Sequence, residues 1–313
     1  MNSLSWKNLI KEIEPYPWTI INKHSDAFLE KNHNLLVDYT RYRKIVQKYL
    51  KYKKLNDFQN ILDVGVYPGC LPQILSKIES IEKYNYFGLG LGFSQEFKNE
   101  MKKIKVNLLD VDLDPRLNLN KNIPNTIPLN SNFCDLIILT DVIEHFFDPF
   151  YPLKEMNRVS KLGGKLILTT DNLPRFDLVF SIFKGNSIYT KLIESNIFFN
   201  GDWRPHFREY SKSELVQLLN WAGFDIVEHE FFNNEFGLHR LENNKIVKRR
   251  ISSSFKSNIR SSIESVLTSI LPRLKNHHII VAEKIDTYES IIKNSPYITT
   301  KTDEWLKLRS RFS

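Results

Sequence analysis

The chain alternates between short apolar runs and longer segments in which apolar and charged residues are mixed. Each run has five to nine residues and is rich in β-branched or aromatic side chains, a pattern typical of buried strands. The runs that we expect to form strands occupy residues 61–65, 86–92, 106–113, 135–141, 165–171, 224–232 and 278–285.

The segments between most of these runs have helical periodicity. They read LPQILSKIES, SQEFKNEMKKI, PLKEMNRVSKL and SKSELVQLLNWAG. Pro72 is expected in a first helical turn, Ser211 and Glu214 form a capping box, and Gly163-Gly164 after VSKL predicts a helix end. Strands that alternate with helices pair in parallel through crossover connections, so the pattern predicts an α/β fold.

Breaks in this alternation suggest how the chain is divided. Residues 1–56 precede the first strand and are expected to form an N-terminal helical cap, while 57–285 form the main domain and 286–313 a C-terminal tail. Insertions are expected at about 172–205 and at about 236–276, the second mostly helical, Ser-rich and basic. We expect both insertions to cover the site.

Composition narrows the class of protein. Of 313 residues, 42% are hydrophobic and 26% are charged, as in a globular protein, and no apolar stretch approaches the roughly 18–20 residues of a membrane span. Cys70 and Cys134 are the only cysteines, too few for a disulfide framework or a zinc cluster. The start of the chain does not read as a secretory signal, so we expect a cytoplasmic protein. The net charge of +8 is compatible with an acidic partner.

The first strand ends in an unusual glycine loop, ILDVGVYPGC at 61–70. Glycine permits backbone angles and close approaches that other residues do not, whereas proline fixes φ. Ligands of open α/β sheets bind at the carboxyl ends of the strands, where this loop would lie. The loop is therefore either a cofactor cradle or an ordinary strand-to-helix turn.

The ordered set of motifs supports the first interpretation. ILDVGVYPG, YFGLGLGFS, VDLDP, DLIILTDVIEH, RVSKLGGKLILTTDN and HFREYSKSELVQLLNWAGF follow one another in the chain. In order and spacing they resemble the class I S-adenosylmethionine-dependent methyltransferases over residues 57–285, most closely the group acting on small molecules, lipids and glycans. The resemblance implies a Rossmann-like, seven-stranded, mostly parallel sheet with helices on both faces, and S-adenosylmethionine as cofactor.

The resemblance also implies a set of cofactor-binding residues. In the family, the loop D-x-G-x-G-x-G wraps the methionine and ribose, and Asp63, Gly65 and Gly69 match it. Tyr67 stands where the middle glycine is usual, and we expect its ring to pack beside the cofactor. Gly90 stands where the family has an acid that binds the ribose hydroxyls, which removes one charge-assisted contact; Ser94 or Gln95 could provide weaker neutral bonds.

Two further positions complete this set. Asp112 in VDLDP matches the acid that accepts a hydrogen bond from the adenine amino group, with Leu113 against the ring. Asp114 is read as a turn residue before Pro115. Asp141, at the end of the fourth run, is also assigned to cofactor binding.

Candidates for the acceptor side follow the fourth and fifth runs. His206 opens a segment similar to the family's H-x-R motif, and His145 and Glu144 lie in TDVIEH. An imidazole titrates near neutral pH and can accept a proton, but His145 could instead pack at a helix start and Glu144 could cap a helix. Asp141, Asp171 and Asn172 are similar to the magnesium set of catechol-type methyltransferases; because Asp141 is one residue out of place, we expect no metal.

These observations favour an O-directed methyltransferase for a small molecule, sugar or lipid-linked glycan. An RNA methyltransferase is one alternative, motivated by the basic and tyrosine-rich segment RYRKIVQKYLKYKK, although its apolar stripe favours a packed helix. A catalytically inactive binding protein is the other, motivated by Tyr67 and Gly90. Residues 245–274 join a basic stretch to an amphipathic helix, which either covers the acceptor pocket as a lid or contacts an anionic membrane.

Overall fold

A computed structural model of the chain describes most of the central region. The described residues are 39–79, 81–114, 123–188, 206–234, 239–242, 245–248 and 255–294, together with positions 6, 8–9, 12–13 and 204. The expected cap at 1–56 is therefore described mainly by its last helix, and the tail at 286–313 by the helix α11, Tyr288–Asn294.

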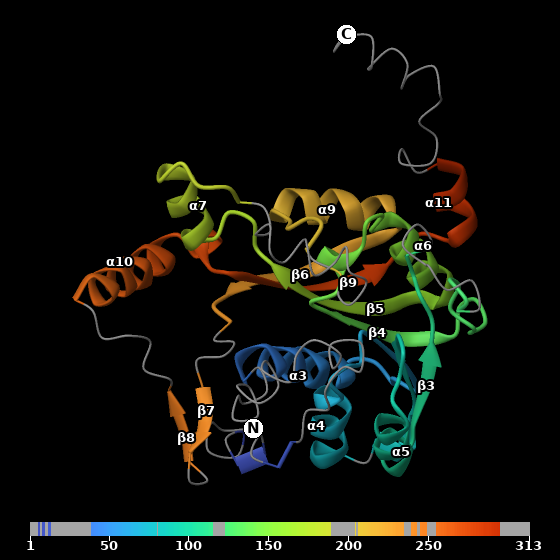
Figure 1. The fold of residues 1–313 in the computed structure, drawn as a ribbon. Helices are drawn as coiled ribbons and strands as arrows, with labels where there is room; N and C mark the ends of the chain where they lie inside the picture. Colours follow the sequence, from blue (N-terminus) through green and yellow to red (C-terminus); the bar gives the residue numbers. More distant parts are fainter. Residues whose placement is uncertain are drawn as a thin grey trace.

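A seven-stranded sheet forms the centre of the molecule (Figure 1). Its order is β3-β2-β1-β4-β5-β9-β6, and every pair from β3 to β5 is parallel, whereas β9 runs antiparallel between β5 and β6. This confirms the mostly parallel α/β fold that the sequence predicted. The strands are β1 Asn60–Val64, β2 Asn85–Gly90, β3 Val106–Asp110, β4 Cys134–Thr140, β5 Ser160–Asp171, β6 Phe224–Phe232 and β9 His277–Lys284.

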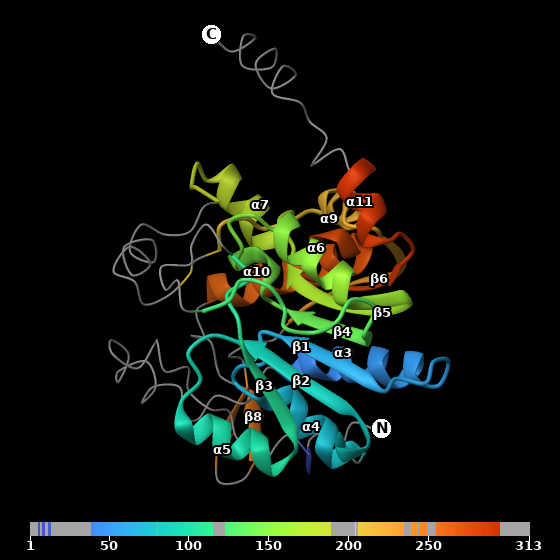
Figure 2. The same cartoon turned by 90° about the vertical axis from the view of Figure 1, so that its right-hand side faces the viewer.

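Helices cover both faces of the sheet (Figures 1 and 2) because the strands direct apolar side chains to each face. On one face, β-strand residues such as Ile61 and Ile138 pack against α3 Tyr39–Lys53, α4 Cys70–Ile78 and α5 Gln95–Lys103. On the other, Leu62 and Ile137 pack against α6 Phe150–Val159 and α9 Lys212–Trp221. The capping box of Ser211 and Glu214 forms at the start of α9, as predicted.

The helix α3 is part of this layered core. Its residues Ile45, Val46 and Tyr49 are buried, so the apolar stripe faces the sheet as predicted. Lys48 lies 2.7 Å and Lys51 lies 2.8 Å from the carboxylate of Glu228 on β6. The lysines therefore attach α3 to the far edge of the sheet.

The predicted end of α6 is wrong. The helix stops at Val159, and β5 begins at Ser160, so Gly163-Gly164 lies inside a strand and does not end a helix. Backbone N–H groups of the segment before β4 bond to the carbonyls of Arg158 and Val159, which draws the chain into the sheet early. A Cβ at Gly164 would lie 2.8 Å from the carbonyl oxygen of Lys161, so the irregular pairing of this part of β5 with β4 requires glycine.

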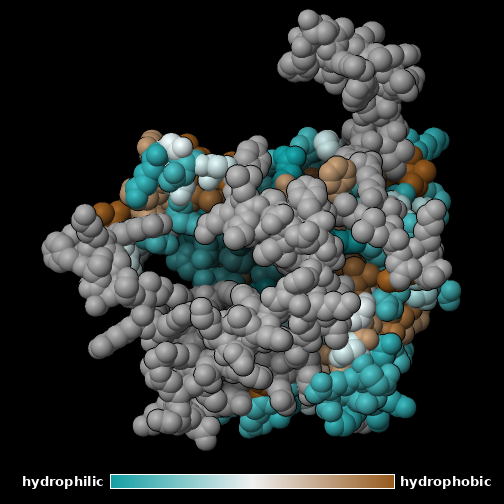
Figure 3. Space-filling view, in the orientation of Figure 1, coloured by the Kyte–Doolittle hydropathy of each residue, from teal (hydrophilic) through white to brown (hydrophobic). Residues whose placement is uncertain are grey.

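The insertion at 236–276 is also less helical than expected. A two-stranded hairpin, β7 His239–Glu242 and β8 Lys245–Lys248, precedes the helix α10, Phe255–Ile270. Ile263, Val266 and Ile270 on α10 are 48%, 57% and 68% exposed. In Figure 3, hydrophobic surface appears at the upper left, where α10 and α7 Phe176–Phe183 lie in Figure 1. Among the described helices, none is long and apolar enough to cross a bilayer.

Candidate active site

A cavity of about 230 Å³ opens at the carboxyl ends of β1, β2 and β4. This is the edge at which open α/β sheets bind ligands. Its lining includes seven residues that the sequence singled out: Gly65, Tyr67, Gly90, Asp112, Leu113, Asp141 and His145. Residues distant in the sequence complete the wall, namely Arg41 from α3 and Arg204.

The glycine loop is shaped by packing from behind. Gly65 has φ +81°, and a Cβ there would lie 2.3 Å from Val142. Gly69 has φ +80° and precedes α4, but it does not line the cavity; its Cβ would meet Phe97 at 2.9 Å and Met101 at 3.0 Å. The need for glycine at position 69 therefore comes from helix packing against α5.

Asp63 likewise supports the loop from below the cavity. It is 1% exposed and accepts a hydrogen bond from the hydroxyl of Tyr86 at 2.9 Å. Burial raises the pKa of Asp63 to about 7. The side chain is not part of the cavity lining, and its bond to Tyr86 links β1 to β2.

Three aromatic rings occupy the region beside Gly90. Tyr67 stacks on Phe97 with 4.2 Å between the ring centroids, and its hydroxyl accepts a hydrogen bond from the backbone N–H of Ser94 at 3.2 Å. A Cβ at Gly90 would lie 3.0 Å from the ring of Phe93. The Ser94 hydroxyl caps α5 by accepting from the Phe97 N–H. The ring of Phe93 therefore lies where an acidic side chain on β2 would start.

Asp112 is held by a cation that the sequence analysis missed. The guanidinium of Arg204 donates to both carboxylate oxygens of Asp112, at 2.8 and 2.6 Å. Asp114 does not simply end a turn: it is buried and accepts a hydrogen bond from the Phe147 N–H at 2.6 Å. Because Asp112 and Arg204 are 92 positions apart, no local pattern indicated this pair.

Asp141 is also held by residues from distant elements. It has φ +49°, forms an ion pair with Arg41, and accepts a hydrogen bond from the Thr169 hydroxyl at 2.7 Å. His277 on β9 lies 3.4 Å from Asp141 and 3.1 Å from Asp171, and so joins the ends of β4 and β5. Burial opposes ionisation, but the charges of Arg41 and His277 lower the pKa of Asp141 well below its ordinary value.

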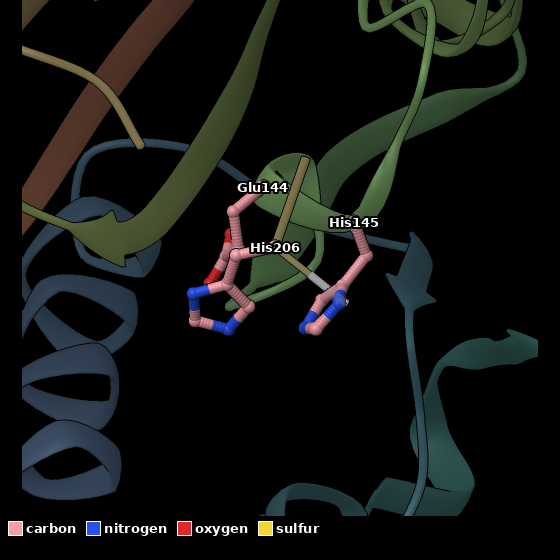
Figure 4. Close-up of side chains that lie close together, drawn as sticks. All are labelled: Glu144, His145 and His206. Atoms are coloured by element: carbon pink, nitrogen blue, oxygen red, sulfur yellow. The ribbon is translucent and has the colours of Figure 1, made fainter. Parts of the chain in front are cut away.

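The three predicted acceptor-side residues lie together (Figure 4). Glu144 and His145 belong to the short 3-10 helix Ile143–His145, and the ring of His206 makes an edge-to-face contact with that of His145, 4.7 Å between centroids. Backbone contacts fix this arrangement: Glu144 O accepts from the Phe207 N–H at 2.8 Å, and Arg204 O accepts from His145 Nδ1 at 2.7 Å.

His206 lines a second hollow. This hollow, of about 350 Å³, is lined by Leu173, Ile188, His206, Phe207, Arg208, Glu209 and Glu214. His145 lines the first cavity and His206 lines the second. The pair of imidazoles therefore separates a pocket with apolar walls from a more polar one.

Charged neighbours shift the titration of this cluster. Burial, together with the carboxylates of Asp141 and Asp171, raises the pKa of Glu144 to about 8. Burial lowers the pKa of His206, but its hydrogen bond with Glu209 and the nearby charges of Glu144 and Asp171 outweigh burial and raise the pKa. Glu144 therefore favours its protonated form at neutral pH, and the pKa of His206 is shifted upward.

The magnesium set considered from the sequence is engaged within the protein. The Asn172 amide donates to the carbonyls of Arg273 and Lys275 at 2.7 and 2.6 Å, while His277 bridges Asp141 and Asp171. These three side chains therefore link strand ends to neighbouring segments of the protein.

Comparison with known proteins identifies the family. A family model described as a methyltransferase domain matches residues 33–229, more than half of the chain, whereas no curated protein matches. Similar solved structures include two S-adenosylmethionine-dependent methyltransferases. That of Archaeoglobus fulgidus is 17% identical (83% of this chain and 100% of that chain covered, TM-score 0.47). That of Thermotoga maritima is 16% identical (85% and 99% covered, TM-score 0.45). The match of the family model shows that the chain belongs to the methyltransferase domain family.

Proposed function

We propose that the protein methylates a hydroxyl group of a small molecule, a sugar or a lipid-linked glycan. One observation carries the proposal: the imidazoles of His145 and His206 lie between the cavity at the strand ends and the polar hollow lined by Arg208, Glu209 and Glu214. The first cavity then takes the cofactor and the second takes the acceptor. Polar side chains in the second suit an acceptor with several hydroxyl groups.

The lining of the first cavity fits S-adenosylmethionine chemically. Arg41 can bind the methionine carboxylate and Asp141 its amino group, because each carries the opposite charge and both line the cavity. Leu113 provides an apolar wall for the adenine. Oδ1 of Asp112 accepts from both Arg204 and the Asp114 N–H, whereas Oδ2 accepts only from Arg204 among these bonds, so the second lone pair of Oδ2 can accept from the adenine amino group.

The protein contributes mainly alignment and control of one proton. The cofactor supplies a methyl group on a sulfonium, which an oxygen nucleophile displaces in line. His206 lies on the acceptor side, where its contacts with Asp171 and Glu209, 3.4 and 3.5 Å from Nδ1, orient the ring. We assign His206 to activation of the acceptor hydroxyl, with His145 and Glu144 beside it.

The alternative of an RNA substrate has less support. Its motivation was the basic segment of α3, but Lys48 and Lys51 are paired with Glu228, and Tyr42 and Tyr49 are 4% and 1% exposed. These tyrosines are therefore not positioned to stack on bases. The other alternative is a binding protein that has lost catalysis. Measuring cofactor affinity and turnover on the same preparation distinguishes it from an active enzyme.

A lipid-linked acceptor would agree with the surface of α10. Ile263, Val266 and Ile270 present apolar side chains to solvent, and Lys248 ends the hairpin that precedes the helix. An amphipathic helix next to basic residues can bind an anionic bilayer peripherally. We therefore include an anionic membrane surface among the proposed partners.

The experiment combines acceptor discovery with one substitution. The protein is incubated with labelled S-adenosylmethionine and with extracts fractionated into small molecules, lipids and RNA, and the labelled product is identified. His206→Ala is expected to lower turnover of that acceptor about 100-fold or more while cofactor affinity in calorimetry stays the same. His229→Gln, which changes a histidine on β6 in contact with His278, is the control and should keep full turnover. Label incorporated only into RNA, or unchanged turnover in His206→Ala, would contradict the proposal.

A further inference from the structure

Glu144, His145 and His206 bring one carboxylate and two imidazoles to a single point beside the acceptor hollow (Figure 4). One ligand atom from each residue lies within 4.8 Å of the others. Two ligands that each lie about 2.1 Å from one ion are at most about 4.2 Å apart. Side-chain movements of less than about 1 Å would therefore place all three around one metal ion.

The hydrogen bonds of the two rings set the nitrogen that can coordinate. Nδ1 of His145 lies 2.7 Å from the Arg204 carbonyl oxygen, which can only accept, so Nδ1 carries the proton and the lone pair is on Nε2. Nδ1 of His206 faces the carboxylates of Asp171 and Glu209. Histidines that bind metals usually donate their other N–H to a carbonyl or carboxylate in this way.

The carboxylate ligand is supported in the same manner. Glu144 is 1% exposed, and one of its oxygens accepts a hydrogen bond from the Thr170 hydroxyl at 2.8 Å. The bond fixes one oxygen of the carboxylate, and the second oxygen can serve as the metal ligand. A buried carboxylate held next to two oriented imidazoles is a donor set and not only a packing arrangement.

The surrounding charges leave room for a dication. Arg41 pairs with Asp141, and Arg175 lies beside Asp171, Asp177 and Glu209, so the carboxylates of this region outnumber the guanidinium groups. A divalent cation between Glu144 and the two rings would displace the Glu144 proton and offset this excess of negative charge.

We propose that Glu144, His145 and His206 bind one divalent transition-metal ion, which coordinates the acceptor hydroxyl. Imidazole ligands favour ions such as Mn²⁺, Co²⁺ and Zn²⁺ over Mg²⁺, and three protein ligands leave open positions for oxygen. The proposal rests on the function proposed above and differs from the metal-free enzyme that the sequence favoured.

The ion would act as a Lewis acid in the transfer. Coordination lowers the pKa of the acceptor hydroxyl, and its proton passes to water. The oxygen then forms a bond to the methyl carbon, the carbon–sulfur bond breaks, and its electron pair stays on sulfur as a thioether. In this case His206 holds the ion that orients and ionises the acceptor hydroxyl, and His206 does not itself take the proton.

The test measures binding of Mn²⁺ directly. The full-length protein is stripped with a chelator, dialysed and titrated with Mn²⁺, and the free ion is followed by electron paramagnetic resonance. One ion per chain is expected, with affinity reduced at least about 10-fold in Glu144→Gln and in His206→Ala. His229→Gln, the matched control at the contact with His278, should bind Mn²⁺ as the unaltered protein does. Cofactor affinity in calorimetry confirms that each variant is folded.

The possible outcomes distinguish a failure of the proposed metal site from a failure of the proposed methyl transfer to a hydroxyl group. Absence of Mn²⁺, Co²⁺ and Zn²⁺ binding at millimolar concentration, equal affinity in Glu144→Gln and His206→Ala, or loss of the site in His229→Gln overturns the metal site. If turnover still depends on His206 in that case, direct proton removal stands. Specific Mn²⁺ binding by a protein that methylates no hydroxyl compound would retain the site and refute the proposed reaction.

Discussion

The aromatic ring beside Gly90 offers a direct test of whether the cofactor ribose binds at Gly90, as the proposed function requires. The sequence resemblance implies an acid at this position, whereas here a Cβ would lie 3.0 and 3.1 Å from two atoms of the Phe93 ring. Phe93 is 7% exposed and stacks on Phe97 with 5.5 Å between centroids, so the ring has little room to move. The perturbation is Gly90→Asp, made alone and together with Phe93→Leu.

The two backgrounds should behave differently. In Gly90→Asp alone, overpacking should lower the free energy of unfolding by about 1–3 kcal/mol, and the displaced carboxylate should add little affinity. Replacing Phe93 by Leu removes the two ring atoms that lie closest to the new Cβ. In that background the aspartate can reach the ribose hydroxyls, and charged hydrogen bonds of about 1.5–3 kcal/mol correspond to about 10- to 150-fold tighter cofactor binding.

Calorimetry with S-adenosylmethionine and with its demethylated product measures the affinities of the four proteins in this double-mutant cycle, and thermal unfolding measures their stability. Phe93→Leu alone is the reference for the double variant. An equal gain from Gly90→Asp in both backgrounds would show that Phe93 does not block the position. No gain in either, with stability retained, would place the ribose away from Gly90.

Three further predictions follow from particular contacts. Gly69→Ala should lower the free energy of unfolding by about 2–4 kcal/mol, because alanine disfavours the left-handed φ and its Cβ would crowd side chains of α5. Cofactor affinity should be preserved in the folded fraction. A stable variant that has lost cofactor affinity would instead assign Gly69 to the cofactor site. Asp63 has a folded-state pKa of about 7, above its unfolded value of about 3.9, so its contribution to stability is greatest at acidic pH and is lost as pH rises through 7. Denaturant unfolding from pH 4 to 8 should therefore show a weaker loss of stability in Asp63→Asn, and an identical pH profile would refute the assignment. The protein should sediment with anionic but not neutral vesicles at low salt. Sedimentation should be weaker when Lys248, Arg249 and Arg250 are changed to Ser; the last two lie outside the described residues. If the protein does not sediment with anionic vesicles, α10 is better explained as a lid over the acceptor pocket.

The sequence determined the fold because the signals for it are local. Apolar runs specified the strands, the Ser211–Glu214 box specified the start of α9, and the stripe on α3 specified which side is buried. The motifs at the ends of β1, β2, β3 and β4 also placed seven residues of the cavity lining, since strand ends of one sheet must meet at one edge.

Tertiary structure decided the contacts that give these residues their chemistry. Arg204 reaches Asp112, and His277 joins Asp141 to Asp171, across large sequence separations and with no periodicity to indicate them. Packing also added contacts at two motif positions: Asp63 accepts a hydrogen bond from Tyr86, and Gly69 lies against Phe97. The physical reason is that hydrophobic periodicity reflects burial of single elements, whereas ion pairs and close contacts depend on the relative positions of several elements.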